Sequence, residues 1–256
     1  MIGTFRRTIK IRDNTAAHGQ EVRGVLEDDF HHFRVAIRHD GATVTAIDAW
    51  AVRHPYSLCP AATRPLRRLI GMPLNRVAHS VTRFTDSAHQ CTHMFELAGL
   101  MIAAAARGDS FRSYRIEVPA RVDGHTVATL YRDNVKDIEW HVDGVYVTGP
   151  EPYVGMNLRA GMARWAIQTL GSGEAESALV LRRAVVISLG REKALDSQRH
   201  AAATGACFVQ QPHRAEYALR MTGSTWDFTT RPQAMGLTNA EWEAAEDARF
   251  WQAMDS

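Results

Sequence analysis

The sequence contains few cysteines, and those it has lie far apart. Its 256 residues include three, namely Cys59, Cys91 and Cys207. Three distant cysteines cannot all pair, whereas small secreted domains use a framework of several disulfides to stabilise a minimal core. We therefore exclude the disulfide-rich class and expect free thiols or ligands in a reducing compartment.

Long apolar runs and long basic runs are also missing. No stretch of about 18 consecutive apolar residues occurs, so no transmembrane helix is expected. The segment Met1–Arg7 lacks the apolar core of a signal peptide. The formal net charge is only +2 and the arginines form short local clusters, which gives nucleic-acid binding no compositional support. We expect a cytoplasmic protein with no membrane or nucleic-acid partner.

Motifs that name a reaction are absent. The chain has no Gly-x-Ser-x-Gly nucleophile elbow, no phosphate-binding loop and no dinucleotide-binding fingerprint. Hydrophobic residues make up 45% and charged residues 23%, as in an ordinary globular protein with a substantial apolar core. Candidate sites must therefore be found from the spacing of individual side chains.

The most informative segment predicts a β-hairpin. Two alternating runs flank Asp40-Gly41, a pair that favours a two-residue type I′ turn because both central positions need positive φ. With these turn residues, strands over 27–39 and 42–54 pair so that His39 faces Ala42. One face of this hairpin is then apolar near the turn and polar at the open end.

The polar end of that face carries acid–base groups beside apolar side chains. Because side chains alternate along a strand, the predicted pairing gathers Glu27, Asp29, His31, Asp48 and His54. His32 and Asp28 are expected to point the other way. A carboxylate at position 29 or 48 would orient an imidazole as a general base. The alternative is a solvated sheet end with a structural histidine.

A second candidate site lies on a helix predicted over 87–107. Ser87 and Gln90 fit a capping box at its start, and Gly108 fits a C-terminal cap. The part from Phe95 to Ala106 is apolar nearly all round, which predicts a buried helix.

Three polar residues of this helix have metal-ligand spacing. His89, His93 and Glu96 would share one face, because residues three and four apart are neighbours on a helix. Two imidazoles and a carboxylate can hold zinc or iron. However, the zinc-protease helix needs glutamate directly after the first histidine, where this chain has Gln90. Buried histidines are more often structural, so we predict no cofactor and keep this metal set as the alternative.

Cys59 is a third candidate. It precedes a short helix predicted over 64–70, with Thr63 as N-cap and Gly71 after its end. A helix N-terminus and the nearby arginines would lower the pKa of this thiol, which would make it a nucleophile, a persulfide carrier or a ligand. The alternative is a buried small residue in a tight turn.

The remaining pattern predicts an α+β fold in one domain over 1–256. Strands are expected over 4–12, 113–118 and 126–131, with a further strand-like run ending at 147, and no internal repeat is evident. Beyond Pro150 the pattern becomes more helical, at 157–170, at 177–189 (helix or strand) and in a tail from Thr238. The antiparallel sheet of the front part, 1–150, is expected to pack against the buried helix, and 151–256 forms a helical back.

The chain resembles a bacterial family known as domain of unknown function 2889. The resemblance covers about the first half and rests on Asp28-Asp29-x-His31-His32, His39-Asp40-Gly41, Arg53-x-Pro55-x-x-x-Cys59-Pro60, Leu69-x-Gly71 and Cys91-Thr92-His93. The family implies no established activity. A weaker similarity is to scaffold proteins for iron–sulfur assembly, in which a hairpin leads into a cysteine loop and then a helix. Those scaffolds use several cysteines, and this front half has only two.

Two functional hypotheses follow from these residues. The first is a cofactor-independent enzyme of small-molecule catabolism, which performs acid–base lyase-type or hydrolytic chemistry on an aromatic or acyl substrate in an apolar pocket. In it, His31 and His54 transfer protons, Asp29 or Asp48 orients them, and His93 polarises the substrate or acts as a second base.

The second hypothesis is a metal- or sulfur-binding protein without turnover, centred on Cys59, Cys91 and His93. A purely structural or interaction module is the third alternative.

Overall fold

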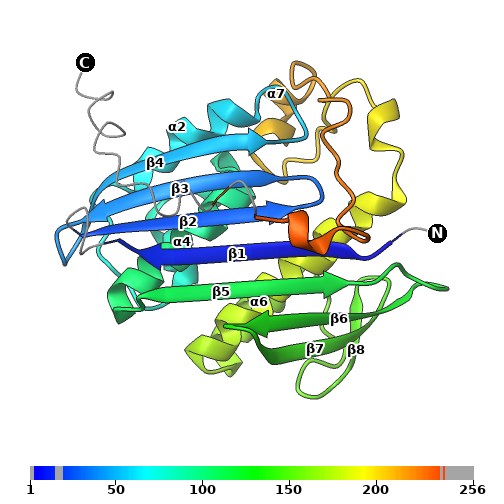
Figure 1. The fold of residues 1–256 in the computed structure, drawn as a ribbon, viewed down its shortest axis with the longest axis horizontal. Helices are drawn as coiled ribbons and strands as arrows, with labels where there is room; N and C mark the ends of the chain where they lie inside the picture. The colour runs from blue at the N-terminus through cyan, green and yellow to red at the C-terminus, as the bar shows by residue number, and fades with distance from the viewer. Residues whose placement is uncertain (1–2, 15–19, 237–238, 240–256) are drawn as a thin grey trace.

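Eight strands form one antiparallel sheet in the computed structural model, which describes residues 3–14, 20–236 and 239 (Figure 1). Their order across the sheet is β4-β3-β2-β1-β5-β6-β7-β8. The strands are β1 (Phe5–Asp13), β2 (Glu21–Asp28), β3 (His32–His39), β4 (Val44–Arg53), β5 (Phe111–Val118), β6 (His125–Arg132), β7 (Val135–Asp143) and β8 (Tyr146–Gly149). The α-helices are α2 (Thr63–Leu66), α3 (Val81–Phe84), α4 (Thr92–Arg107), α5 (Met162–Thr169), α6 (Ser172–Ser188) and α7 (Pro212–Ala215). The predicted α+β class with an antiparallel sheet is confirmed.

The sheet consists of two consecutive four-stranded meanders. β1–β4 form the first and β5–β8 the second, and antiparallel pairing of β1 with β5 joins them at the centre. Each meander is followed along the chain by a long helix, α4 after the first and α6 after the second. The duplication is one of topology, since the sequence itself has no evident repeat.

Both long helices cover the same face of the sheet. Ile9 of β1 pairs with Leu26 of β2 and with Tyr114 of β5, so these three side chains share a face. The Tyr114 hydroxyl donates to Glu176 of α6 at 2.5 Å, and α4 contacts β1, β2 and β3. Figure 1 shows both helices behind the sheet. The core therefore lies between the sheet and this helix layer.

Helix α4 is buried, as its apolar sequence predicts, but it starts later than expected. It ends at the predicted cap, where Gly108 has φ 74°. Its first residue is Thr92, because the backbone is extended at Gln90 and Cys91. Residues 87–89 form a separate 3₁₀ turn capped by Asp86, whose side chain accepts from the amide of Ala88. The predicted start at Ser87 is therefore wrong.

The predicted hairpin register is also wrong. Asp40 and Thr43 close a longer loop, in which the Asp40 carboxylate accepts from the amides of Ala42 at 2.8 Å and Thr43 at 2.7 Å. Ile37 consequently pairs with Ile47, three positions from the partner that the two-residue turn predicts. A shift by an odd number exchanges the two faces of a strand.

The first strand of that predicted hairpin is in fact two strands. Residues 21–28 form β2 and residues 32–39 form β3, joined by a tight turn at Asp29-Phe30-His31. Asp28 and His31 therefore lie at the two ends of a turn and do not alternate along one strand. This turn is the start of the candidate site below.

The other expected elements are found in part. The strand predicted over 4–12 is β1, and those over 113–118 and 126–131 are β5 and β6. The uncertain segment 177–189 is helical, within α6. The short helix predicted over 64–70 is divided between α2 and a 3₁₀ turn at Arg67–Leu69. The helix predicted from Thr238 lies outside the described residues. No helix in the described part of the chain is long and apolar enough to cross a membrane.

A C-terminal strap crosses the end of the sheet. The amide of Met221 donates to the carbonyl of Pro55, and that of Trp226 donates to the carbonyl of Asp29 at 2.7 Å. Further along, the amide of Gly236 donates to Glu27 at 2.7 Å. This strap, residues 220–236, brings late sequence against the β2–β3 turn, as the orange segment in Figure 1 shows.

Gly24 of β2 lies directly beneath α4. A Cβ at this position would lie 2.5 Å from Met101 Sδ and 3.0 Å from Leu97 Cδ1. We predict that Gly24→Ala lowers the free energy of unfolding by about 1–3 kcal/mol in urea titrations, because the helix must shift outward. As a control, Gly173→Ala in the exposed first turn of α6 should raise it by up to about 1 kcal/mol. Equal effects of both substitutions would contradict the close helix–sheet contact.

Candidate functional site

The turn between β2 and β3 is organised by one carboxylate. Asp28 Oδ1 accepts from the amides of Phe30 at 2.8 Å and His31 at 2.9 Å, and the Asp28 amide donates to the His31 carbonyl at 2.8 Å. Aspartate favours such turns because its short side chain caps amides two and three residues further on. The turn thereby fixes the direction of the His31 side chain.

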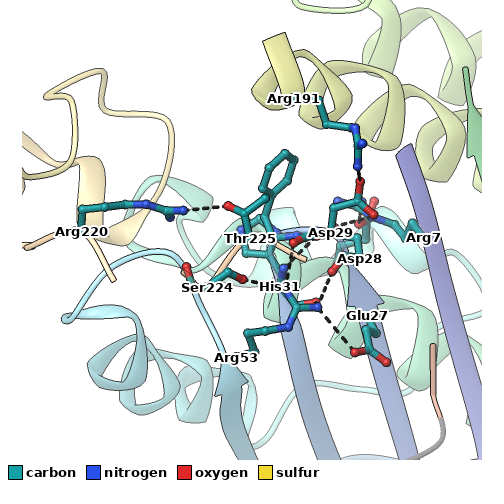
Figure 2. A network of polar contacts seen from close by, with 12 residues as sticks. Arg7, Glu27, Asp28, Asp29, His31, Arg53, Arg191, Arg220, Ser224 and Thr225 are labelled. Atoms are coloured by element: carbon teal, nitrogen blue, oxygen red, sulfur yellow. Dashed lines mark hydrogen bonds and ion pairs between the residues drawn. The ribbon is translucent and has the colours of Figure 1, made fainter. Parts of the chain in front are cut away.

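Three arginines from distant elements hold this turn (Figure 2). Arg7 of β1 binds the side chain of Asp28. Arg53, the last residue of β4, donates to the carbonyls of Asp28 at 2.5 Å and Asp29 at 2.9 Å. Arg191, beyond α6, donates to the Asp29 carboxylate. The turn is therefore held by two strands of the first meander and by the segment that follows α6.

The Arg7–Asp28 pair is completely buried. Arg7 Nε and Nη2 lie 3.0 Å and 2.6 Å from Asp28 Oδ2, and both side chains have no solvent exposure. Burial acts to raise the pKa of Asp28, but His31 and Arg7 outweigh it and hold that pKa well below its usual range. Asp28 is therefore ionised and can only accept hydrogen bonds.

His31 and His93 stack beside this carboxylate. His31 Nδ1 lies 2.9 Å from Asp28 Oδ1, so it carries the proton and donates to the ionised oxygen. The two imidazole rings have centroids 3.9 Å apart and planes inclined by 30°. His93, on the first turn of α4, is buried, and its Nε2 has no hydrogen-bond partner among the described residues. Burial, then His31 and Arg7, lower the pKa of His93 well below its ordinary value, which keeps the ring neutral.

These three side chains can share one ion. One ring nitrogen of each histidine and one carboxylate oxygen of Asp28 all lie within 4.8 Å of one another. An ionised Asp28 and a neutral His93 are in the protonation states that metal ligation requires of these two groups. The described part of the chain contains no other group of three histidine, cysteine or acidic side chains this close together.

Two further predicted residues lie close to this cluster. Asp29 follows Asp28, and burial raises its pKa to about 7, a rise that the ion pair with Arg191 limits. His54 follows β4 and has Nδ1 2.9 Å from the carbonyl of Tyr56. Burial lowers the pKa of His54, and the charge of His31 lowers it further.

Other predicted residues lie elsewhere. Asp48 pairs with Ala36 in the β3–β4 ladder and binds Arg67 at 2.9 Å. His89 is on the separate 3₁₀ turn, half exposed and 3.7 Å from Asp86. The predicted ligand face of His89, His93 and Glu96 is therefore not formed, because the helix begins after His89.

The three cysteines gather at the same end of the sheet. Cys59 and Cys207 pack in one apolar cluster, and the amide of Phe208 donates to the carbonyl of Gln90, next to Cys91. Burial raises the pKa of all three thiols, that of Cys91 to about 12. The expected lowering of the Cys59 pKa is wrong, because desolvation outweighs the nearby positive charge.

Sequence reasoning missed Asp28 and Arg7. Asp28 was assigned to the opposite face because the segment was taken as one strand. The spacing Asp28-x-Phe30-His31 carried the missing signal, since aspartate before two capped amides is typical of a turn. Arg7 had no local signal, because its partner lies 21 residues away.

Residues 5–107 match the model of a family described as "Protein of unknown function (DUF2889)". This segment, less than half of the chain, is similar to the DUF2889 family. It begins with β1 and ends with the last residue of α4, so it contains the first meander, its helix and the Asp28–His31–His93 cluster. The match ends before Cys207. No curated protein and no solved structure compared with the chain matches it.

We predict that Arg7→Met lowers the free energy of unfolding by about 3–5 kcal/mol, because it leaves Asp28 buried without its guanidinium. The measurement is urea unfolding, and Asp28→Asn in the same background should recover part of the loss, since the two residues are coupled. Lys136→Met, at an exposed pair with Glu139, serves as control and should change stability by only about 0–1 kcal/mol. If the effects of Arg7→Met and Asp28→Asn on the free energy of unfolding simply add in the double variant, the two residues are not coupled and the prediction is wrong.

We also predict that Cys59, Cys91 and Cys207 are inert in the folded protein. Because burial disfavours each thiolate, iodoacetamide at about pH 8 should alkylate them at least tenfold more slowly than in guanidinium-unfolded protein. Peptide mass spectrometry gives the rate for each cysteine. Native labelling of Cys59 at the unfolded rate would restore its predicted role as a reactive nucleophile.

Proposed function

We propose that this protein is a cytoplasmic metal-dependent enzyme that binds a divalent transition metal at Asp28, His31 and His93. The observation that carries the proposal is the buried Nε2 of His93, which has no partner among the described residues and lies in a cluster with a second imidazole and an ionised carboxylate. A buried polar atom without a partner costs about 1–3 kcal/mol, which a function at that atom would explain.

The cluster is compact enough for its side chains to share one ion. One ring nitrogen of each histidine and one oxygen of Asp28 lie within 4.8 Å of one another. A metal bound through His31 Nδ1 would displace the proton that this nitrogen shares with Asp28 Oδ1, 2.9 Å away. Two histidines and one carboxylate form the ligand set of catalytic zinc and of non-haem iron(II), and three protein ligands leave positions open for water or substrate.

Arg7 and the turn amides would act as the outer shell of this centre. They bind the oxygens of Asp28 and fix its orientation, which is what neighbours of a ligating carboxylate do in metal sites. The reaction class that fits is metal-assisted hydrolysis or lyase-type cleavage, in which the ion polarises the substrate or lowers the pKa of a bound water. The expected substrate remains a small aromatic or acyl compound.

A second candidate function rests on the same pair of atoms. If Asp28 Oδ1 and His31 Nδ1 share a proton, the carboxylate orients the imidazole as a cofactor-independent general base, as the first sequence hypothesis requires. This reading leaves Nε2 of His93 without a role. The two candidates therefore differ in whether a metal or a proton joins Asp28 to His31.

Metal analysis of untagged protein separates them. We predict about one zinc or iron per chain by mass spectrometry, and removal of the metal with a chelator should lower the melting temperature. Saturation at a hundredfold excess over the dissociation constant adds about 2.7 kcal/mol to the free energy of unfolding. His93→Gln and His31→Gln should each remove both the bound metal and this stabilisation.

His89→Gln is the matched control, because His89 lies four residues before His93 and outside the cluster. It should retain full metal content. If folded wild-type protein binds neither zinc nor iron, the metal proposal fails. In that case, nitrogen-15 spectra of the histidine rings should show a neutral His31 with its proton on Nδ1, as the general-base candidate requires.

A further inference from the structure

A cavity of about 460 Å³ lies between the two long helices. α4 and α6 form its sides, α5 and the segment 77–82 close it further, and residues 205–206 contribute at one edge. Its walls are largely apolar and include Val81, Phe95, Leu100, Ile167, Leu179 and Val180. The volume is in the range of pockets that hold small organic ligands, about 300–1,000 Å³.

The acidic groups of this cavity are already neutralised. Glu96 Oε1 lies 3.0 Å from Arg183 Nε, and Glu96 Oε2 lies 3.6 Å from Arg7 Nη1. Glu176 accepts from the Tyr114 hydroxyl and forms an ion pair with Arg107 at 3.0 Å. Neither carboxylate is left to balance another cation.

Arg182 supplies an additional positive charge. It has no ion pair within the described ranges, and its one side-chain hydrogen bond there runs from Nη2 to the carbonyl of Arg159 at 3.4 Å. Its Nε is buried without a partner among those residues. Burial lowers the pKa of Arg182 and the negative charge of Glu96 acts to raise it, but the Glu96 carboxylate is already paired with Arg183.

The pKa of His79, another residue of the cavity wall, responds to the positive charge of the nearby arginines. Burial lowers the pKa of this cavity residue, and the charges of Arg183, Arg182 and Arg83 lower it further. A neutral imidazole beside an unbalanced guanidinium offers an anion donors and no repulsion.

We propose that this cavity binds a small monoanion with an apolar body, such as an aliphatic or aromatic carboxylate, with Arg182 holding the charged group. The apolar walls would take up the body of the ligand, and one guanidinium would balance one negative charge. Arginine suits this role because its planar fork matches a carboxylate with two parallel hydrogen bonds.

The cavity adjoins the candidate metal centre. Glu96 lines the cavity and contacts Arg7, and Arg7 binds Asp28 on its other side. Two residues, Glu96 and Arg7, would thus connect a ligand in the cavity to the Asp28–His31–His93 cluster. The binding proposal does not depend on the metal, so it is tested on chelator-treated protein.

Calorimetric titration with phenylbutyrate and with the uncharged phenylbutanol tests the proposal. The acid should bind, and the alcohol should bind roughly ten- to hundredfold more weakly, because it lacks the charge-assisted hydrogen bonds. Arg182→Met should weaken binding of the acid by a similar factor and leave binding of the alcohol unchanged. Arg182→Lys keeps the charge but loses the planar fork, so its affinity for the acid should lie between those of the wild type and Arg182→Met. Arg164→Met is the control, since Arg164 is an exposed arginine on α5 outside the cavity.

Ala163→Phe should abolish binding of both compounds, because the larger side chain fills the cavity from α5. Thermal unfolding verifies that each variant is folded. Equal affinity for acid and alcohol, equal effects of Arg182→Met and Arg164→Met, or no binding to folded wild-type protein would each overturn the proposal. Retained acid binding in folded Ala163→Phe would overturn it as well, since the anion would then bind elsewhere.

Discussion

The buried ion pair between Arg7 and Asp28 is the interaction on which the rest of this site depends. Placing two charges out of water costs several kcal/mol for each ion unless close geometry and further hydrogen bonds offset it. Here the two nitrogens of Arg7 and two turn amides meet both oxygens of Asp28. Once ionised and fixed, that carboxylate determines the tautomer of His31 and holds its ring against His93.

The architecture explains why these groups can meet. β1, which carries Arg7, is a central strand that pairs with both β2 and β5, and the alternate side chains on its helix-facing side, Arg7 among them, are buried. The β2–β3 turn lies at one end of the first meander, and the N-terminus of α4 lies over the same end. The strap then covers the turn through the amide of Trp226, while the Arg53 guanidinium lies 4.4 Å from the Trp226 ring.

The sequence was informative where structure follows local periodicity. Alternation predicted β1 and β5, and continuous apolar character with a glycine cap predicted the body and end of α4. The sequence-based prediction failed where an aspartate side chain accepts hydrogen bonds from backbone amides and so interrupts the regular element. Asp28 ends a strand, Asp40 lengthens a loop and Asp86 caps a separate turn. His31 and His93 were identified as candidates, but Arg7, Arg53 and Arg191 were not, because residues far along the chain are brought to them only by the complete fold.

The meeting of two meanders at β1 and β5 has a consequence for how such a protein changes over time. The Asp28–His31–His93 cluster lies entirely within the DUF2889 segment, whereas the cavity takes one wall from that segment and the opposite wall from α5 and α6 beyond it. The three candidate metal ligands and the proposed anion-binding residue Arg182 thus come from different parts of the chain. Under the two proposals, substitutions in α5 and α6 would change which ligand the cavity accepts and leave the three candidate metal ligands in place.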